Sequence, residues 1–190
     1  MSAFEHVMSL ISFVFALAIA HLLSCGIAIF RAGSRARLSF AHTAWMIVSL
    51  LQVTIWWLAF WDFRLMKSWD VGFVAFTLVA GILVYVYTGL VCPEVPKEGE
   101  LDLGEFHRAH GRQYITVYLA LGLVGLAYGA IYGYFYDVPE QSAQNAIIVP
   151  MMVIAFVALI SRNLTVQNIC AGATLAAYPI YFWVGQRPLQ

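Results

Sequence analysis

The sequence contains few charged residues. Asp, Glu, Lys and Arg make up only 11% of its 190 residues, whereas a soluble domain typically carries about 25%. Hydrophobic residues make up 62% of the chain, and the mean hydropathy is +0.81. Ten basic residues balance ten acidic ones, so there is no positive field that would attract nucleic acid. This composition predicts an integral membrane protein surrounded by the lipid bilayer, and it argues against nucleic acid as a partner.

The motifs of common enzyme classes are also absent. The three cysteines, Cys25, Cys92 and Cys170, form no C-x-x-C or C-x-x-C-H pattern, which excludes a zinc ribbon and c-type haem attachment. The sequence has no G-x-S-x-G, P-loop or H-E-x-x-H motif. Every Asp, Glu, Lys and Arg lies at or near the end of a predicted helix, so none is placed to couple ion movement inside a bilayer. These absences favour a non-catalytic protein but leave an enzymatic role open.

Six apolar runs are each close to the roughly 20 residues that a helix needs to cross a bilayer. They lie near residues 5–30, 41–63, 70–91, 112–136, 144–161 and 165–184. The sequence therefore predicts an all-α integral membrane protein in which residues 1–190 form a single six-transmembrane-helix bundle. The connection between the fifth and sixth runs is so short that the two should form an antiparallel hairpin.

The connections between these runs differ in their content of Lys and Arg. The side that includes both termini holds three such residues: Arg64, Lys67 and Arg187. The other side holds seven: Arg31, Arg35, Arg37, Lys97, Arg108, Arg112 and Arg162. Because Lys and Arg concentrate in cytoplasmic loops, we expect both termini on the non-cytoplasmic side of the inner (plasma) membrane. Residues 92–111 then form a cytoplasmic charged loop, within which the capping-box spacing of Asp102 and Glu105 predicts that helix four begins near residue 103.

The fourth predicted helix carries a regular pattern of glycines. They form a groove without side chains along one face, beside a stripe of tyrosines: Gly122, Gly125, Gly129 and Gly133, then Tyr128, Tyr132 and Tyr136. Because a glycine inside a helix costs about 1 kcal/mol relative to alanine, the pattern predicts close helix packing. A flexible, gate-like helix is the alternative. The packing partner is either a second copy of helix four, which gives a homo-oligomer, or a small-residue stripe on helix one: Ser12, Ala16, Ala20 and Ser24.

Polar and indole side chains recur on one face of the second predicted helix, at steps of three and four residues. They are His42, Trp45, Ser49, Gln52 and Trp56. Polar side chains avoid lipid because their hydrogen bonds are unmet there, so this face should point into the bundle. Two interpretations remain open: hydrogen bonding between helices, or the wall of a pocket or conduit. Further polar positions come from helices three and six: Thr77, Gly81, Tyr85, Thr88, Thr174, Tyr178 and Tyr181.

The histidines raise the questions of haem and metal. His21, deep in the first span, is expected to face inward, either as a neutral hydrogen-bonded residue or in a proton-handling or ligand role. It lies about 10 Å from His42 in depth, at about 1.5 Å per residue, so the two make a poor axial pair. We predict no cofactor, with haem as the least favoured alternative. His107 and His110 form an H-x-x-H, a weak metal candidate, and both are expected to be solvated near the lipid headgroups.

Three function classes follow from these patterns. The first is a non-catalytic membrane subunit that packs against a partner or against copies of itself. The second is a channel or carrier for a small, largely neutral molecule, with a polar and aromatic interior lined by helices one and two. The third is a haem-containing or other redox membrane protein. The direction in which the polar face of helix two points separates the first two classes.

Overall fold

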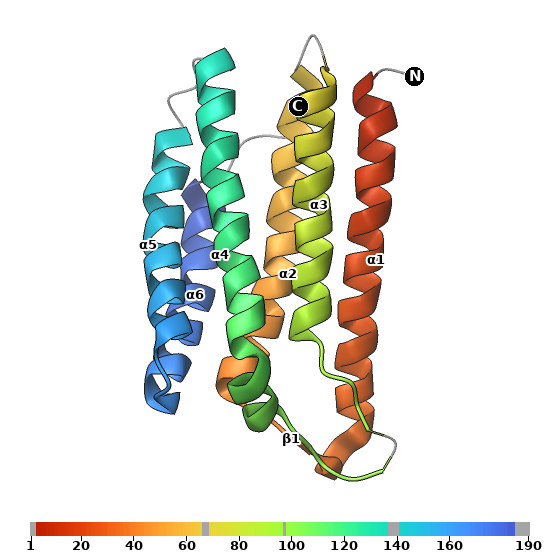
Figure 1. Ribbon diagram of the computed structural model, residues 1–190, viewed down its shortest axis with the longest axis vertical. Helices are drawn as coiled ribbons and strands as arrows, with labels where there is room; N and C mark the ends of the chain where they lie inside the picture. The colour runs from red at the N-terminus through yellow and green to blue at the C-terminus, as the bar shows by residue number, and fades with distance from the viewer. Residues whose placement is uncertain (1–2, 66–68, 97, 137–140, 185–190) are drawn as a thin grey trace.

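The computed structural model describes residues 3–65, 69–96, 98–136 and 141–184 of the chain. This part forms six long α-helices and two very short strands (Figure 1). The elements are α1 Ala3–Ala32, β1 Ala36–Arg37, α2 Phe40–Trp61, α3 Val71–Val91, β2 Leu101–Asp102, α4 Leu103–Tyr136, α5 Gln141–Ile160 and α6 Leu164–Val184. The all-α class is confirmed, and each of the six helices overlaps one predicted run.

Four segments in the described part of the chain are long and apolar enough to cross a membrane. They are Phe4–Arg35, Phe40–Trp61, Val71–Val91 and Leu103–Ala130. In α5 the described apolar segment, Asn145–Ile160, is shorter. Large apolar side chains cover the outer surface, as in Phe13 and Phe30, which are 62% and 87% exposed. Such an apolar exterior would be unfavourable in water, so these features indicate a membrane protein.

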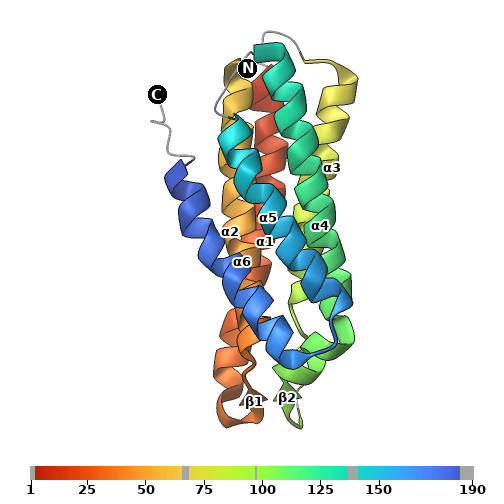
Figure 2. The same ribbon diagram turned by 90° about the vertical axis from the view of Figure 1, so that its left-hand side faces the viewer.

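The helix α2 lies at the centre of the bundle, in contact with α1, α3, α4 and α6. At one edge, α1 packs on α3 and α2; at the other, α5 packs on α4 and α6 (Figures 1 and 2). The chain reverses direction between α5 and α6, so the predicted antiparallel hairpin is confirmed. One of the two partners predicted for the glycine groove, the small-residue stripe of helix one, is wrong, because Ala16, Ala20 and Ser24 are exposed on the outer side of α1.

Side-chain caps explain where three of the helices begin. Asp70 accepts a hydrogen bond of 2.8 Å from the backbone N–H of Phe73 at the start of α3. One oxygen of Asp102 accepts from the N–H groups of Gly104 and Glu105, at 2.8 and 3.0 Å, at the start of α4. Asn163 caps α6 in the same way. These bonds satisfy N–H groups that the helices themselves cannot pair, and they confirm that helix four begins near residue 103.

A two-strand contact ties the loops together at the lower end of Figure 1. β1 and β2 pair in parallel, with Ala36 opposite Leu101 and Arg37 opposite Asp102. An exposed ion pair of 3.3 Å joins Arg37 to Glu100 beside them. Within the predicted charged segment 92–111, α4 occupies the last nine residues, in agreement with the predicted start of helix four.

Aromatic rings fill the opposite end of the bundle. The ring of Phe63 contacts those of Phe73, Tyr128 and Phe60, at centroid distances of 4.5, 5.0 and 5.4 Å. The hydroxyl of Tyr128 donates a hydrogen bond of 2.8 Å to the carbonyl of Ala59. This aromatic cluster joins α2, α3 and α4 near the end where α3 begins.

Candidate functional site

The polar face of α2 lies inside the bundle. His42, Trp45 and Ser49 are fully buried, Trp56 is nearly so, and Gln52 is half-buried. α2 can present this face inward because it contacts four other helices, α1, α3, α4 and α6. The inner polar surface therefore runs along α2 from its first turn to its fifth.

Three other helices complete the walls around this face. Tyr118 of α4 packs edge-on against Trp45, with ring centroids 5.2 Å apart, and lies 5.9 Å from the ring of Tyr87 on α3. From α6, the hydroxyl of Tyr178 donates a hydrogen bond of 2.5 Å to Oε1 of Gln52. We call this set of inward-facing side chains from α2, α3, α4 and α6 the polar interior.

Many polar atoms of the polar interior have no hydrogen-bond partner. In the described part of the chain, five of ten such buried atoms belong to the α2 face: both ring nitrogens of His42, the indole nitrogens of Trp45 and Trp56, and the hydroxyl of Ser49. The hydroxyls of Tyr87 and Thr174 add two more. Native proteins contain few such groups, and each costs about 1–3 kcal/mol when buried alone. Their concentration makes the polar interior the candidate functional site of the described residues.

A hydrogen-bonded chain closes the polar interior at the end where α4 begins. His107 Nε2 lies 3.1 Å from Oε1 of Gln167 on α6, and His107 Nδ1 contacts the hydroxyl of Tyr114. The amide nitrogen of Gln167 donates to the carbonyls of Ala158 and Ser161, at 2.6 and 2.7 Å. Because the amide nitrogen of Gln167 is occupied as a donor, its Oε1 must be the acceptor for His107, and Nε2 of that ring therefore carries a proton. In the neutral ring, Nδ1 then accepts a hydrogen bond from the hydroxyl of Tyr114.

His107 corrects the prediction that both histidines of the H-x-x-H are solvated. It is only 3% exposed, because α4 begins at Leu103 and turns this face towards α6. His110 is exposed, and its Nδ1 lies 3.3 Å from the carbonyl of Phe106. The two rings thus lie in different surroundings. Within the described residues, no group of three or more His, Cys, Asp or Glu side chains could hold a metal ion.

His21 corrects the prediction of an inward-facing histidine on helix one. It is exposed, whereas the buried face of α1 consists of larger residues such as Ile11, Phe15 and Leu22. The interior is therefore lined by α2, α3, α4 and α6, not by α1 and α2. His21 and His42 do not face a common space.

Sequence reasoning also missed Tyr87 and named Tyr85 in its place. Tyr85 is 43% exposed, and Tyr87 is fully buried. The available signal was the spacing Ala80, Val84, Tyr87 at steps of four and three, which marks the buried face of α3.

The glycines of α4 meet side chains of the same chain. A Cβ added at Gly122 would lie 2.8 Å from Met152 of α5, and one at Gly125 would lie 3.9 Å from the ring of Trp56. Gly129 is buried as well. The side-chain surroundings of Tyr132 and Gly133 lie outside what the structure describes. At least the first part of the groove is thus filled within the bundle, without a second copy.

Comparison of the chain with protein-family models, with characterised proteins and with solved structures finds no significant match.

Proposed function

We propose that this protein spans a membrane with six helices and carries a small, uncharged, hydrogen-bonding molecule through the polar interior. The observation that carries the proposal is the set of unpartnered buried atoms on α2. His42 contributes both of its ring nitrogens, one a donor and one an acceptor in the neutral ring. A molecule that offers both kinds of group satisfies them at once.

The rival interpretation is that these side chains only join helices. The bond between Gln52 and Tyr178 supports that interpretation at one position. It does not account for Ser49, Trp45 or Trp56, whose polar atoms reach no group of a neighbouring helix. At about 1–3 kcal/mol for each unpaired group, five such atoms would cost as much as the whole stability of a typical domain, about 5–15 kcal/mol. We therefore favour a guest over packing alone.

The side chains that line the polar interior restrict the chemistry of the small molecule proposed to pass through it. The buried polar side chains among the described residues are those of His42, Ser49, Thr77, Thr88, His107 and Thr174, and none of them is an acid, a lysine or an arginine. A buried ion without a counter-charge is strongly disfavoured, so the guest is uncharged. Indole and phenol rings flank the polar atoms and provide apolar contact surface.

The closed ends fit a carrier more closely than a permanently open channel. The aromatic cluster around Phe63 fills one end, and the His107–Gln167 contact closes the other. Alternating access would open these two ends in turn. The Lys and Arg distribution supports an inner-membrane location with the His107 end in the cytoplasm, although Lys67, Lys97 and Arg187 lie outside the described residues.

The test is solute flux through the full-length protein in lipid vesicles. Uptake of glycerol, urea and water is followed by stopped-flow light scattering, with protein-free vesicles as the baseline. We expect at least one solute to enter faster with the protein, and Gln52→Leu to abolish the increase while the bundle stays folded. Thr54→Val is the matched control, because that hydroxyl bonds only to the carbonyl of Leu50 within α2. If no solute moves faster than the baseline, or if Gln52→Leu changes thermal stability alone, the proposal is wrong.

A further inference from the structure

Two of the three cysteines come together at the end of the bundle where α3 ends. Cys25 on α1 and Cys92, the residue that follows α3, are both free thiols, and a hydrogen bond joins their side chains. The sulfur of Cys25 also lies 3.9 Å from the carbonyl oxygen of Pro93. Both cysteines pack in a small apolar cluster with Ile29 and Leu103. The fold therefore brings into contact two thiols that are far apart in the sequence.

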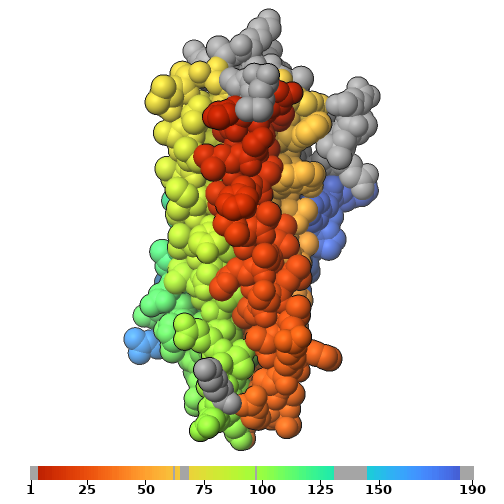
Figure 3. Space-filling view, turned by 90° about the vertical axis from the view of Figure 1, so that its right-hand side faces the viewer, coloured from red at the N-terminus to blue at the C-terminus, as the bar shows by residue number. Residues whose placement is uncertain are grey.

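Two helices fix the positions of these thiols. Cys25 lies on the inner face of α1, three residues after Leu22 and four before Ile29, all of which are buried. Cys92 caps the end of α3, because Pro93 has no backbone N–H with which to continue the helix. α1 and α3 lie side by side along one face of the molecule (Figure 3). The contact between the two thiols thus follows from the packing of α1 on α3.

We propose that Cys25 and Cys92 form a redox-active pair, which an oxidised low-molecular-weight thiol converts into an intramolecular disulfide. One protein thiol loses its proton and attacks the disulfide bond of the oxidant, which releases one small thiolate and leaves a mixed disulfide. The other protein thiol then loses its proton and attacks the protein sulfur of the mixed disulfide, which releases the second small thiolate. The two released thiolates take up the two protons. The protein pair is thus oxidised by two electrons, and the small disulfide is reduced to two thiols.

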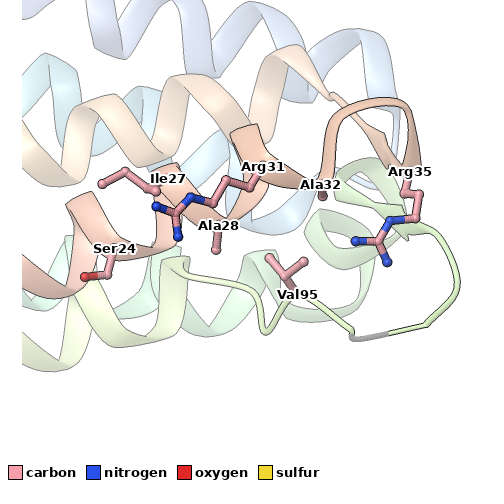
Figure 4. Close-up of a pocket in the computed structure, with 7 residues that line it drawn as sticks. All are labelled: Ser24, Ile27, Ala28, Arg31, Ala32, Arg35 and Val95. Carbon is pink, nitrogen blue, oxygen red and sulfur yellow. The ribbon is translucent and has the colours of Figure 1, made fainter.

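A small reagent can reach the pair from the surface. Cys92 is only half-buried, and it lies just beyond the end of the apolar segment of α3. A groove of about 500 Å³ opens nearby, between the last turns of α1 and Val95 of the loop that follows α3. Figure 4 shows this loop running beside α1, with Val95 below Ala28. Ser24, the residue before Cys25, also lines the groove, and Val95 packs against the same apolar cluster as the two cysteines.

The disulfide ties α1 to the end of α3. Its two sulfur atoms must come within about 2.05 Å of each other, and no other group stands between thiols that share a hydrogen bond. Because the bond closes a long stretch of chain into a loop, it restricts the unfolded chain and stabilises the folded one. The Lys and Arg distribution favours the cytoplasm for this end of the bundle, where disulfides are transient and often redox-sensing. The thiol pair can react whether or not the polar interior carries a solute.

The experiment exposes the full-length protein in a neutral detergent to mixtures of glutathione and glutathione disulfide that range from reducing to oxidising. After an acid quench, free thiols are labelled with a maleimide and counted by intact mass spectrometry. We expect the wild type, which has three thiols, to lose two of them together without retaining glutathione, and to recover both in excess glutathione. Peptide mapping should place the disulfide between Cys25 and Cys92. The oxidised protein should also unfold at a higher temperature than the reduced protein.

Single substitutions separate the pair from the third cysteine. Cys170→Ser is the matched control and should still form the disulfide, because Cys170 is buried on α6 in the main core. Cys25→Ser and Cys92→Ser should each prevent the disulfide and remove the difference in unfolding temperature between oxidised and reduced protein. Circular dichroism of each variant shows that the loss of the disulfide is not a loss of folding.

Three results would overturn the proposal. The first is a wild type that keeps all three thiols in the most oxidising mixture. The second is a disulfide that includes Cys170 or joins two chains. The third is a disulfide that excess glutathione does not reduce, which would make it a structural crosslink and not a redox-active pair.

Discussion

Gln52 on α2 accepts a hydrogen bond of 2.5 Å from the hydroxyl of Tyr178 on α6, 126 residues further along the chain. It is the side-chain bond that connects the central helix directly to α6 through the polar interior. Both residues lie at helical spacings from unpartnered groups, Ser49 on α2 and Thr174 on α6. Substitutions of Gln52 or Tyr178 should therefore change both the stability of the bundle and the passage of a solute through the polar interior.

Removing the hydroxyl of Tyr178 should destabilise the bundle. Tyr178→Phe leaves the Gln52 amide without its partner, so we expect a loss of about 1–3 kcal/mol in the free energy of unfolding, measured by thermal denaturation in detergent. The double variant Gln52→Leu/Tyr178→Phe removes both partners and should be more stable than the sum of the single effects predicts. Tyr85→Phe, at an exposed position, is the control. Additive effects in the double variant would show that the bond contributes nothing.

A side chain at Gly122 should force α4 and α5 apart. Its Cβ would lie 2.8 Å from Cγ and Sδ of Met152, so Gly122→Leu should lower the free energy of unfolding by about 1–3 kcal/mol through overpacking. Shortening the opposing residue, in Gly122→Ala/Met152→Ala, should relieve the clash seen in Gly122→Ala alone. Gly89→Ala is the control, because nothing lies within 4 Å of its added Cβ. Crosslinking tests the self-association prediction separately: a smaller oligomer in Gly122→Leu with unchanged stability would point to a second copy in the groove.

Gln167 should hold the α5–α6 hairpin against α4. Gln167→Leu removes the donation to the Ala158 carbonyl of α5, the donation to the Ser161 carbonyl just after α5, and the acceptor for His107. Because these groups are part-buried, we expect a loss of roughly 1–3 kcal/mol, together with faster hydrogen exchange at the end of α5. Gln113→Leu, at an exposed position on α4, serves as the comparison. Unchanged exchange in Gln167→Leu would mean that the hairpin is held by apolar contacts alone.

The start of α4 should weaken in acid. Hydrogen bonds from the backbone N–H groups of Glu105 and Gly104 lower the pKa of Asp102 below its ordinary value. The ionised carboxylate therefore stabilises the folded state at any pH above the pKa that Asp102 has in the unfolded chain. This stabilisation is lost as the pH falls through the lower pKa that Asp102 has in the folded state. Between about pH 6 and about pH 3, around the ordinary value of about 3.9, the wild type should lose more thermal stability than Asp102→Asn. A larger loss of thermal stability in Asp102→Asn than in the wild type would contradict this prediction.

The sequence by itself determined the helices and the inward face of α2. Local properties suffice for both: the length of each apolar run, caps such as Asp102 and Asn163, and polar groups at steps of three and four that cannot face lipid. The residues from His42 to Trp56 therefore lie where the periodicity predicted.

Only the tertiary structure decided which neighbours cover each face. In a membrane protein both the interior and the lipid-facing surface are apolar, so hydropathy could not show that the small-residue face of α1, with His21, points outward. For the same reason it could not choose Tyr87 over Tyr85 on α3, or Met152 and Trp56 as the residues that meet the α4 glycines. His107 was misjudged because its burial depends on Gln167, 60 residues away. Contacts of that kind depend on how the helices pack, and a local sequence pattern does not predict that packing.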